Sequence, residues 1–133
     1  MACATLHHWD DPAVGLRELR RVARGPVVIL TFDLAHLVAW QRDYLAPLIE
    51  IERRRHLTPA EIAAVLGRRT RIDALRTPTD CEDGFLDAYW SRPEALLDPR
   101  VRATQSAWSL ISDETEREIV DRLRADLASG VWA

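Results

Sequence analysis

The stretch PVVILTFD, residues 26–33, decides the fold class, because it is an almost continuous run of β-branched and other apolar residues that ends in an acid. Such a run is typical of a strand that is covered on both faces, as in a parallel sheet. The segment MACATL, residues 1–6, is small and apolar like the end of another buried strand. Because a helical segment joins the two, residues 1–32 predict a strand–helix–strand unit of an α/β fold.

The helix between these two strands carries a start signal and a stop signal. Asp10 or Asp11 can accept hydrogen bonds from the first free amide groups, and Pro12 suits the first turn. Apolar residues then recur at helical spacing until Gly25. We therefore expect the helix to cross from one strand to the next over one face of the sheet.

A long helical pattern follows over residues 34–56, with a kink or break expected near Pro47. The arginine run at 53–55 is predicted to be the solvated end of that helix, with docking or anion binding as the alternative. Thr58 and Glu61 have the spacing of a capping box, which predicts the start of a further short helix.

The second half of the chain is predicted to be largely helical, with helices that start at Asp98 and Ser112. Residues 69–78, RTRIDALRTP, alternate like a strand. No repeat, low-complexity tract or linker separates these parts, so we expect a single domain over residues 1–133.

Composition narrows the class of protein. The formal net charge of −3 gives no general attraction to nucleic acid, and no apolar run reaches the roughly 20 residues of a membrane-spanning helix. Cys3 and Cys81 are far apart and belong to no CxxC pair, which predicts neither a disulfide framework nor a zinc finger. With no secretory signal at the start, we expect a soluble cytoplasmic protein without nucleic-acid or membrane partners.

The segment TLHHWDDP, residues 5–12, gathers two histidines, a tryptophan and two aspartates between the first strand and the helix. A metal site is disfavoured there, because adjacent side chains on an extended segment point to opposite faces and both aspartates can cap the helix. The sequence contains no Gly-x-Ser-x-Gly nucleophile elbow and no glycine-rich phosphate loop. We therefore predict neither a metal centre nor a hydrolase of that type.

Two segments carry a resemblance to a known family. Residues 6–33, LHHWDDPAVGLRELRRVARGPVVILTFD, resemble the second half of a class I S-adenosylmethionine-dependent methyltransferase of the small-molecule, type 11-like group. Residues 80–108, DCEDGFLDAYWSRPEALLDPRVRATQSAW, are similar to a segment of one bacterial branch of those enzymes. The resemblance implies a partial Rossmann-like methyltransferase fold with few strands and S-adenosylmethionine as the family's cofactor.

The sequence departs from the family pattern at both ends. The family's Gly-x-Gly loop, which holds the methionine part of the cofactor, and the acid that holds the ribose both precede the first residue that matches here. We therefore expect a truncated methyltransferase-like domain, and the missing loop argues against methyl transfer by this chain alone. A reading frame that starts upstream of Met1 is the alternative explanation.

The resemblance also implies which residues face the cleft. His7 and His8 are carried over as catalytic candidates, one of them as a base toward an acceptor hydroxyl or amine, although both can equally pack or cap. Trp9 accompanies them as a substrate-binding candidate. The other predicted substrate-binding residues are Asp33, which can instead cap the next helix, and Asp80, Asp83, Phe85, Tyr89 and Trp90 of the substrate-side lid, where Phe85 and Trp90 can equally belong to the core.

Two classes of function follow from these observations. The chain can be an enzyme that uses acid–base chemistry for cyclisation, isomerisation or dehydration of a small biosynthetic intermediate. Alternatively, it is a non-catalytic partner that completes or regulates a methyltransferase or another biosynthetic enzyme. A partly covered sheet predicts a homodimer, a larger assembly or a partner chain, and Trp132 can seal an oligomer contact.

Overall fold

The computed structural model describes residues 1–131, so Trp132 and its predicted oligomer contact lie outside the described residues. The protein is mixed α/β and mostly helical. Its contacts divide it into two compact units. Unit 1 comprises Met1–His36 and Glu52–Ala74, and unit 2 comprises Leu37–Ile51 and the described residues from Leu75 onward. The single domain over the whole chain stays a prediction.

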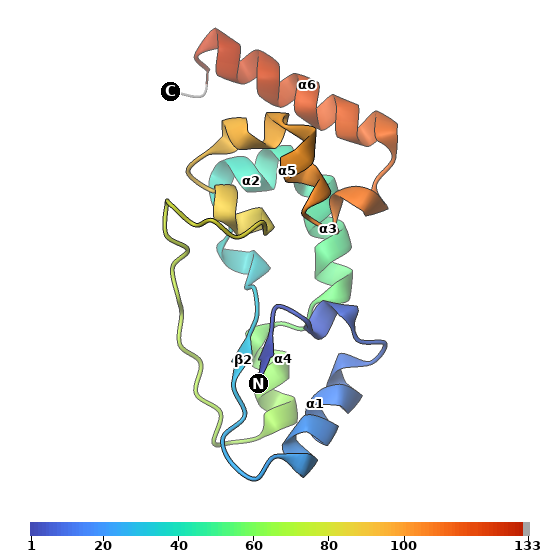
Figure 1. Ribbon diagram of the computed structural model, residues 1–133, viewed down its shortest axis with the longest axis vertical. Coiled ribbons are helices and arrows are strands. Elements are labelled where there is room, and N and C mark those ends of the chain that lie inside the picture. Colours follow the sequence, from blue (N-terminus) through green and yellow to red (C-terminus); the bar gives the residue numbers. More distant parts are fainter. Residues whose placement is uncertain (132–133) are drawn as a thin grey trace. The chain divides into compact units, whose positions relative to one another are not determined.

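The α-helices in chain order are α1 (Pro12–Val22), α2 (Ala39–Tyr44), α3 (Ala46–Arg55), α4 (Pro59–Leu66), α5 (Pro99–Ala103) and α6 (Asp113–Ser129) (Figure 1). Short 3₁₀ turns join them, namely η1 (Leu6–His8), η2 (Leu34–His36), η3 (Leu86–Tyr89), η4 (Pro93–Leu97) and η5 (Trp108–Leu110). Within the described residues, no helix has both the length and the apolar character that crossing a bilayer requires.

Unit 1 is built on the predicted strand–helix–strand unit. The strands β1 (Ala2–Cys3) and β2 (Ile29–Leu30) lie side by side and parallel, with Ala2 opposite Ile29, and α1 is the crossover between them (Figure 1). α1 packs against α4. Together these elements cover a small core whose buried members are Ala2, Leu6, Leu16 and Ile62.

The strand prediction for residues 26–33 was wrong in its length and in its burial. Only Ile29–Leu30 is strand, and Val28 and Leu30 are 54% and 44% exposed. Among the described residues β2 pairs with β1 alone, so the apolar run lacks the neighbours that would cover it. The strand predicted over residues 69–78 is also absent, because that segment has no strand beside it and its apolar Ile72 and Leu75 are exposed.

The predicted helix boundaries were confirmed where capping residues marked them. Asp11 accepts a hydrogen bond from Val14 N, Thr58 and Glu61 form the capping box of α4, and Ser112 accepts from Thr115 N at the start of α6. The long helical pattern breaks at Leu45, two residues before Pro47. Side-chain oxygens at these positions satisfy amides that the helix itself leaves free.

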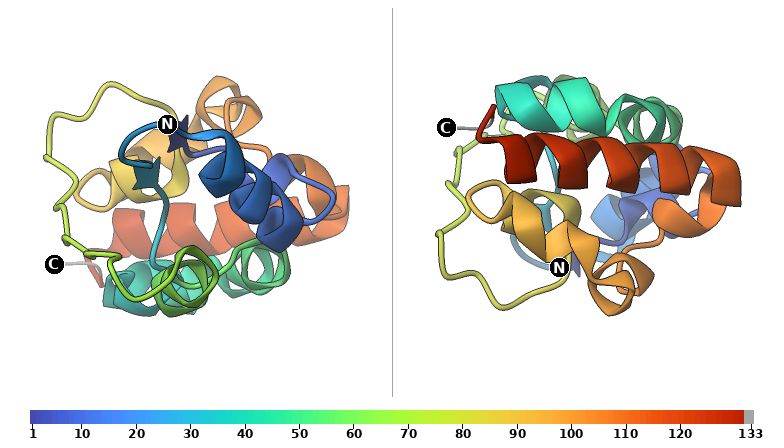
Figure 2. Two further views of the ribbon diagram at one scale, coloured as in Figure 1. Left: turned by 90° about the horizontal axis from the view of Figure 1, so that it is seen from below. Right: turned by 90° about the horizontal axis from the view of Figure 1, so that it is seen from above.

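Unit 2 packs α6 against two other elements, α2 and η4. The buried residues of α6 are Ile119, Val120 and Leu123, and α2 and η4 appear on opposite sides of the helix when it is seen from above (Figure 2, right). The buried Arg102 donates from Nε to Glu116 at 2.6 Å and from Nη1 to the Leu96 carbonyl at 2.7 Å. This buried charge is therefore neutralised by an acid of α6.

Candidate functional site

His7 lies against two other histidines of unit 1. The His7 and His8 rings, on η1, have centroids 4.0 Å apart. The His7 ring also stacks on His56, which directly follows α3, with centroids 4.5 Å apart and an interplanar angle of 23°. His8 is exposed, His7 is half-buried, and the His56 side chain is only 6% exposed. The cluster therefore extends from the surface to a buried imidazole.

The chain reaches this arrangement through a tight bend after β1. Ala4 has a backbone φ of 49°, in the left-handed region that residues other than glycine rarely adopt. Its N–H donates to the Leu30 carbonyl at 2.9 Å, so the bend is fixed to β2. The following η1 turn anchors Leu6 in the core and leaves His7 and His8 at its end. Backbone strain of this kind often marks functional segments.

Glu52 holds His56 from the preceding turn of α3. The His56 Nδ1 lies 2.9 Å from the Glu52 carboxylate and 3.0 Å from the Glu52 carbonyl oxygen. Because both neighbours can only accept, Nδ1 carries a proton and, in the neutral ring, Nε2 carries the lone pair. Arg55 donates to the other Glu52 oxygen at 3.0 Å. The arginine run is thus not solvated throughout, because the Arg55 side chain is 23% exposed and paired.

The Nε2 atom of His56 is the chemically distinctive atom of this cluster. It is buried and has no hydrogen-bond partner within the described residues. The other buried side-chain polar atoms without a partner in that part of the chain are Arg92 Nε, Gln105 Oε1 and Trp108 Nε1. None of these three takes up a proton near neutral pH, whereas an imidazole nitrogen does. His56 is therefore the one of the four that is suited to proton transfer.

Burial and neighbouring charges shift two pKa values in the cluster. Burial, and then the nearby charges of His56 and His8, lower the pKa of His7 to about 4. Burial raises the pKa of Glu52, but the hydrogen bond from His56 and the charges of His56, Arg55 and His7 together bring that pKa below its usual value. At neutral pH, His7 is uncharged and Glu52 is ionised.

The structure places the other predicted site residues of unit 1 in packing and capping positions. Trp9 packs on the core of unit 1, where a Cβ added to Gly15 would lie 2.2 Å from its ring. Asp33 accepts from Ala35 N at 3.1 Å and lies 2.9 Å from His36 Nδ1, so it caps η2. Substrate binding by Trp9 or Asp33 stays a prediction.

The predicted substrate-side residues of unit 2 fall into two groups. Asp80 and Asp83 are exposed on the loop before η3, where Asp83 accepts from Gly84 N at 2.8 Å. The aromatic members are Phe85, Tyr89 and Trp90, which are all half-buried at η3. Arg92 lies over the Tyr89 ring at 5.4 Å, and Trp90 Nε1 donates to the Thr77 carbonyl at 3.0 Å. Their role in binding stays a prediction.

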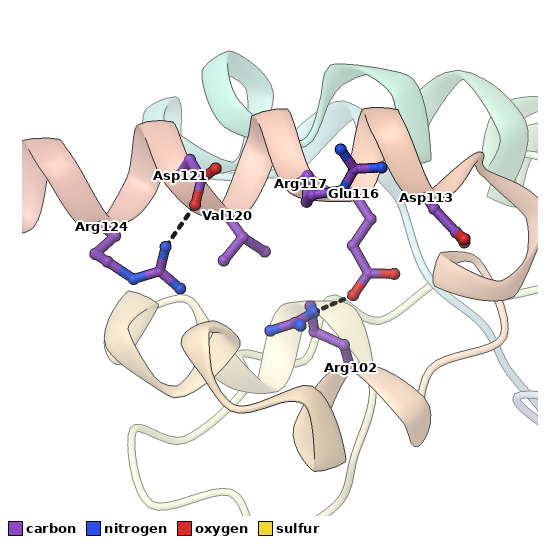
Figure 3. A pocket seen from close by; sticks show the side chains of 7 residues that line it. All are labelled: Arg102, Asp113, Glu116, Arg117, Val120, Asp121 and Arg124. Atoms are coloured by element: carbon purple, nitrogen blue, oxygen red, sulfur yellow. Dashed lines mark hydrogen bonds and ion pairs between the residues drawn. The ribbon is translucent and has the colours of Figure 1, made fainter.

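A charged hollow of about 330 Å³ lies along α6, and Figure 3 shows its lining side chains. Glu116 reaches from α6 to Arg102, and Asp121 pairs with Arg124 on the same helix. Four of the lining charges therefore pair with one another, and Asp113 and Arg117 are the other two charged residues of the lining. Within residues 1–131, no group of three or more histidine, cysteine, aspartate or glutamate side chains could hold a metal ion.

Sequence reasoning missed Glu52 and His56, although the signal was present. The two residues are four apart within a segment that was predicted to be helical, and that spacing puts them on one face. The contact between His56 and His7 had no such signal, because the two residues are 49 positions apart and meet only through tertiary packing. Pairing His7 with a buried partner therefore required the structure.

The chain is similar to one solved structure over nearly its whole length. That crystal structure is of a protein from Anabaena variabilis ATCC 29413 named as a candidate methyltransferase from an antibiotic biosynthesis pathway, with 32% identity and a TM-score of 0.84. The match covers 98% of this chain and 55% of that one, so this chain spans about half the length of its neighbour. No family model matches the sequence, and no curated protein matches it significantly. The chain has a methyltransferase-like fold.

Proposed function

We propose that this protein performs acid–base chemistry on a small molecule of bacterial metabolism, at the cluster of His7, His8 and His56. One observation carries the proposal: Glu52 holds His56 through Nδ1, while the buried Nε2 has no partner in the described residues. A carboxylate that orients an imidazole and leaves its second nitrogen free is the arrangement that general bases use. In this proposal the protein works in the cytoplasm, where its two free cysteines stay reduced.

The proposed step is the removal of a proton from a substrate hydroxyl, amine or activated carbon. The proton passes to Nε2 of His56, the electron pair stays on the substrate atom, and the imidazolium that forms is stabilised by the ionised Glu52. Arg55 fixes the second carboxylate oxygen and keeps Glu52 in this orientation. Because Nε2 is buried, the proposal requires the His7–His8 turn to move before a substrate can reach it.

His7 has a different part in this proposal from the one that the sequence suggested. With a pKa near 4 it is a weak base, but it is uncharged and can accept a hydrogen bond at any pH at which a cell operates. It therefore orients the substrate proton and shields the imidazole of His56. His8 is exposed and meets the substrate first.

The residues of this chain do not form the main binding site that S-adenosylmethionine requires. The five glycines stand at 15, 25, 67, 84 and 130, so no two of them form a Gly-x-Gly loop. At Gly15, in the first turn of α1, the Trp9 ring occupies the space that could otherwise receive a ligand. No step of the proposal passes through the cofactor. Methyl transfer, which the structural neighbour suggests, would require the cradle to come from residues outside this sequence.

Two measurements test this proposal. In the first, the 133-residue chain is titrated with S-adenosylmethionine in a calorimeter beside light scattering, and we expect no micromolar binding. In the second, the protein is incubated with a bacterial metabolite extract, and product masses are followed. A loss of about 18 Da indicates dehydration, no mass change with a shifted retention time indicates isomerisation, and a gain of about 14 Da indicates methylation.

Matched variants decide whether the cluster is responsible. We expect His56→Gln and Glu52→Gln to lower turnover by about 10²- to 10⁴-fold, the usual contribution of a general base. His36→Gln, which changes an exposed histidine of unit 1 outside the cluster, should keep full turnover. Undiminished turnover in folded His56→Gln, His7→Gln and His8→Gln variants would sink the proposal.

A partner role is the second candidate, and two exposed apolar residues, one just before β2 and one in it, favour it. Val28 and Leu30 are 54% and 44% exposed, and a sheet of this size is marginal without further cover. A second copy or a partner chain that adds cover there would bury both side chains. Under this candidate Val28→Asp lowers the mass measured by light scattering while His56→Gln leaves it unchanged. An unchanged monomeric mass in the wild-type protein and in Val28→Asp would argue against self-association.

A further inference from the structure

The charges of the chain are divided unevenly between the two units. Unit 1 contains ten arginines and seven acidic residues, whereas unit 2 contains eight arginines and fourteen acidic residues. Unit 1 therefore has a formal excess of three positive charges and unit 2 an excess of six negative charges. The net charge of −3 for the whole chain conceals this division, because the division follows from the fold.

Part of the positive charge of unit 1 gathers along the second half of α1. Arg17, Arg20 and Arg24 are exposed and follow one another at intervals of three and four residues, which places them along one side of the helix and of the turn after it. Within residues 1–131 none of the three has a hydrogen-bond or ion-pair partner. Arg21 differs, because it donates to Glu18 at 2.7 Å. Three arginines of this stripe are thus available to a partner.

The end of α4 adds two further arginines to this region. Arg68 and Arg69 directly follow the α4 C-cap and are exposed, and neither is paired within the part of the chain that the structure describes. Leu19 of α1 and Leu66 of α4 pack on the same core, and both helices end at the same end of unit 1 (Figure 1). We call Arg17, Arg20, Arg24, Arg68 and Arg69 the arginine face.

The helix termini beneath the arginine face explain only a small part of it. A helix C-terminus carries a partial negative charge of about half a unit, which favours nearby cations. The two ends, of α1 and α4, therefore offset about one of the five positive charges. The remaining positive charge faces solvent, where it attracts an acidic surface.

An acidic loop of unit 2, residues 80–83, has the complementary charge. Its acids Asp80, Glu82 and Asp83 are exposed and form no ion pair with any described residue. Arg92 Nη2 donates to the Cys81 carbonyl at 2.6 Å, so the middle of the loop is fixed to η4. The loop therefore presents its carboxylates from an anchored backbone.

The two sets of charges also agree in length. Arg17 and Arg24 are seven residues apart, which corresponds to about 10 Å along a helix. Asp80 and Asp83 are three residues apart and can span at most about 10 Å. A single exposed ion pair contributes little, but a matched set of opposite charges steers association and selects which surfaces meet.

We infer that the arginine face of one copy of this protein binds the acidic loop of a second copy. The second copy is the occupant because its acidic loop supplies the charge that the arginine face lacks. The contact joins two different patches, so two copies can form it twice around a two-fold axis or a larger ring can close. It gives Asp80 and Asp83 a role other than the predicted substrate binding, and it is independent of the proposed proton transfer.

Salt dependence of the mass tests this contact. The full chain is followed by analytical ultracentrifugation at about 20 mM and about 300 mM salt, between which the Debye length falls from roughly 20 Å to roughly 6 Å. We expect a mass above the 15.2 kDa of one chain at low salt and a return to one chain at high salt. A contact through the apolar side chains of β2 would persist at high salt.

Two charge-reversed variants identify the surfaces. In Arg20→Glu/Arg24→Glu both patches are acidic, and in Asp80→Arg/Glu82→Arg both are basic, so each variant alone should dissociate at least about tenfold more readily at low salt. An equal mixture of the two should associate again, because each patch then meets one of opposite charge. Arg53→Glu/Arg117→Glu reverses two exposed arginines outside the arginine face and should associate about as tightly as the wild type.

Three outcomes would overturn the inference. The first is a wild-type protein that stays a single chain at low salt, and the second is an assembly whose mass does not respond to salt or to either reversal. The third is a mixture of the two reversed variants that remains dissociated. A monomeric wild type that binds duplex DNA through the same arginines would assign the face to nucleic acid instead. All four substituted side chains are exposed, so folded variants are expected and circular dichroism verifies them.

Discussion

The two units of the molecule treat their buried charged and titratable groups in opposite ways. In unit 2 the buried Arg102 donates to Glu116 and to a carbonyl oxygen, and it lies over the Trp108 ring. These contacts neutralise its charge and hold the elements of unit 2 together. In unit 1 Glu52 and His56 also pair, but the pair leaves an imidazole nitrogen without a partner in the described residues. The comparison shows that a buried ion pair alone does not mark a site, and the proposed function therefore rests on the imidazole nitrogen that the pair in unit 1 leaves without a partner.

The largest test of this comparison removes one core leucine from each unit. Leu16 and Leu123 are both fully buried, so Leu16→Ala and Leu123→Ala should each lower the free energy of unfolding by about 2–5 kcal/mol. Because each leucine packs inside its own unit, we expect the loss of amide protection to stay in that unit. Hydrogen exchange followed by mass spectrometry measures this for peptides from both. Equal loss of protection across both units in either variant would show one cooperative structure instead.

A glycine from each unit gives a smaller and sharper contrast. A Cβ at Gly15 would lie 2.2 Å from the Trp9 ring, whereas a Cβ at Gly84 would lie 2.6 Å from the Thr104 hydroxyl. The indole is large and packed on the core. Thr104 is exposed, but its Cβ would lie 3.0 Å from the added carbon and its hydroxyl donates to the Val101 carbonyl, so the whole residue has to shift. We expect Gly15→Ala to cost about 1–3 kcal/mol despite the better helix propensity of alanine, and Gly84→Ala to cost about 1 kcal/mol, because an exposed threonine shifts more easily than a packed indole. Denaturant titration of both variants gives the two values, and equal costs would contradict the packing that we assign to Trp9.

The sequence predicted local features well because those features depend on near neighbours. Thr58 and Ser112 cap the helices that they were predicted to cap, and Asp11 is the one of the two predicted alternatives, Asp10 or Asp11, that caps α1. A cap needs only the residue and the two or three amides after it. The parallel strand–helix–strand unit was also predicted, from residues within one crossover.

The failures are features that depend on distant residues. The stretch at 26–33 has the composition of a fully covered strand, but strand length is set by the neighbours that pair with it, and β1 alone pairs with β2 among the described residues. The sequence predicted only part of the candidate site, for the same reason. His7 and His8 were named, while the buried His56 that stacks on His7 was not, because no local pattern joins the two.

The smallest predicted effect is a pH dependence that belongs to unit 1. The pKa of His7 is about 4 in the folded chain, below its ordinary value near 6.5. Between these two values the unfolded chain binds more protons than the folded one, so the free energy of unfolding falls as the pH drops from about 6.5 toward 4. Solvent screening of this half-buried group reduces the expected loss to roughly 1 kcal/mol. Glu52 acts in the same direction, but its low pKa places its effect at more acidic pH.

Thermal unfolding measured in steps from pH 7 to pH 5 isolates the part due to His7, because Glu52 stays ionised over that range. His7→Gln removes the titrating group and should therefore flatten the slope. His36→Gln, at an exposed histidine of the same unit, should keep it. Parallel stability curves for the wild type and His7→Gln would mean that His7 is protonated as easily in the folded as in the unfolded chain. The lowered pKa that we assign to His7 in its stack with His56 would then be wrong. The difference in electrostatics that we describe between the two units would lose that support.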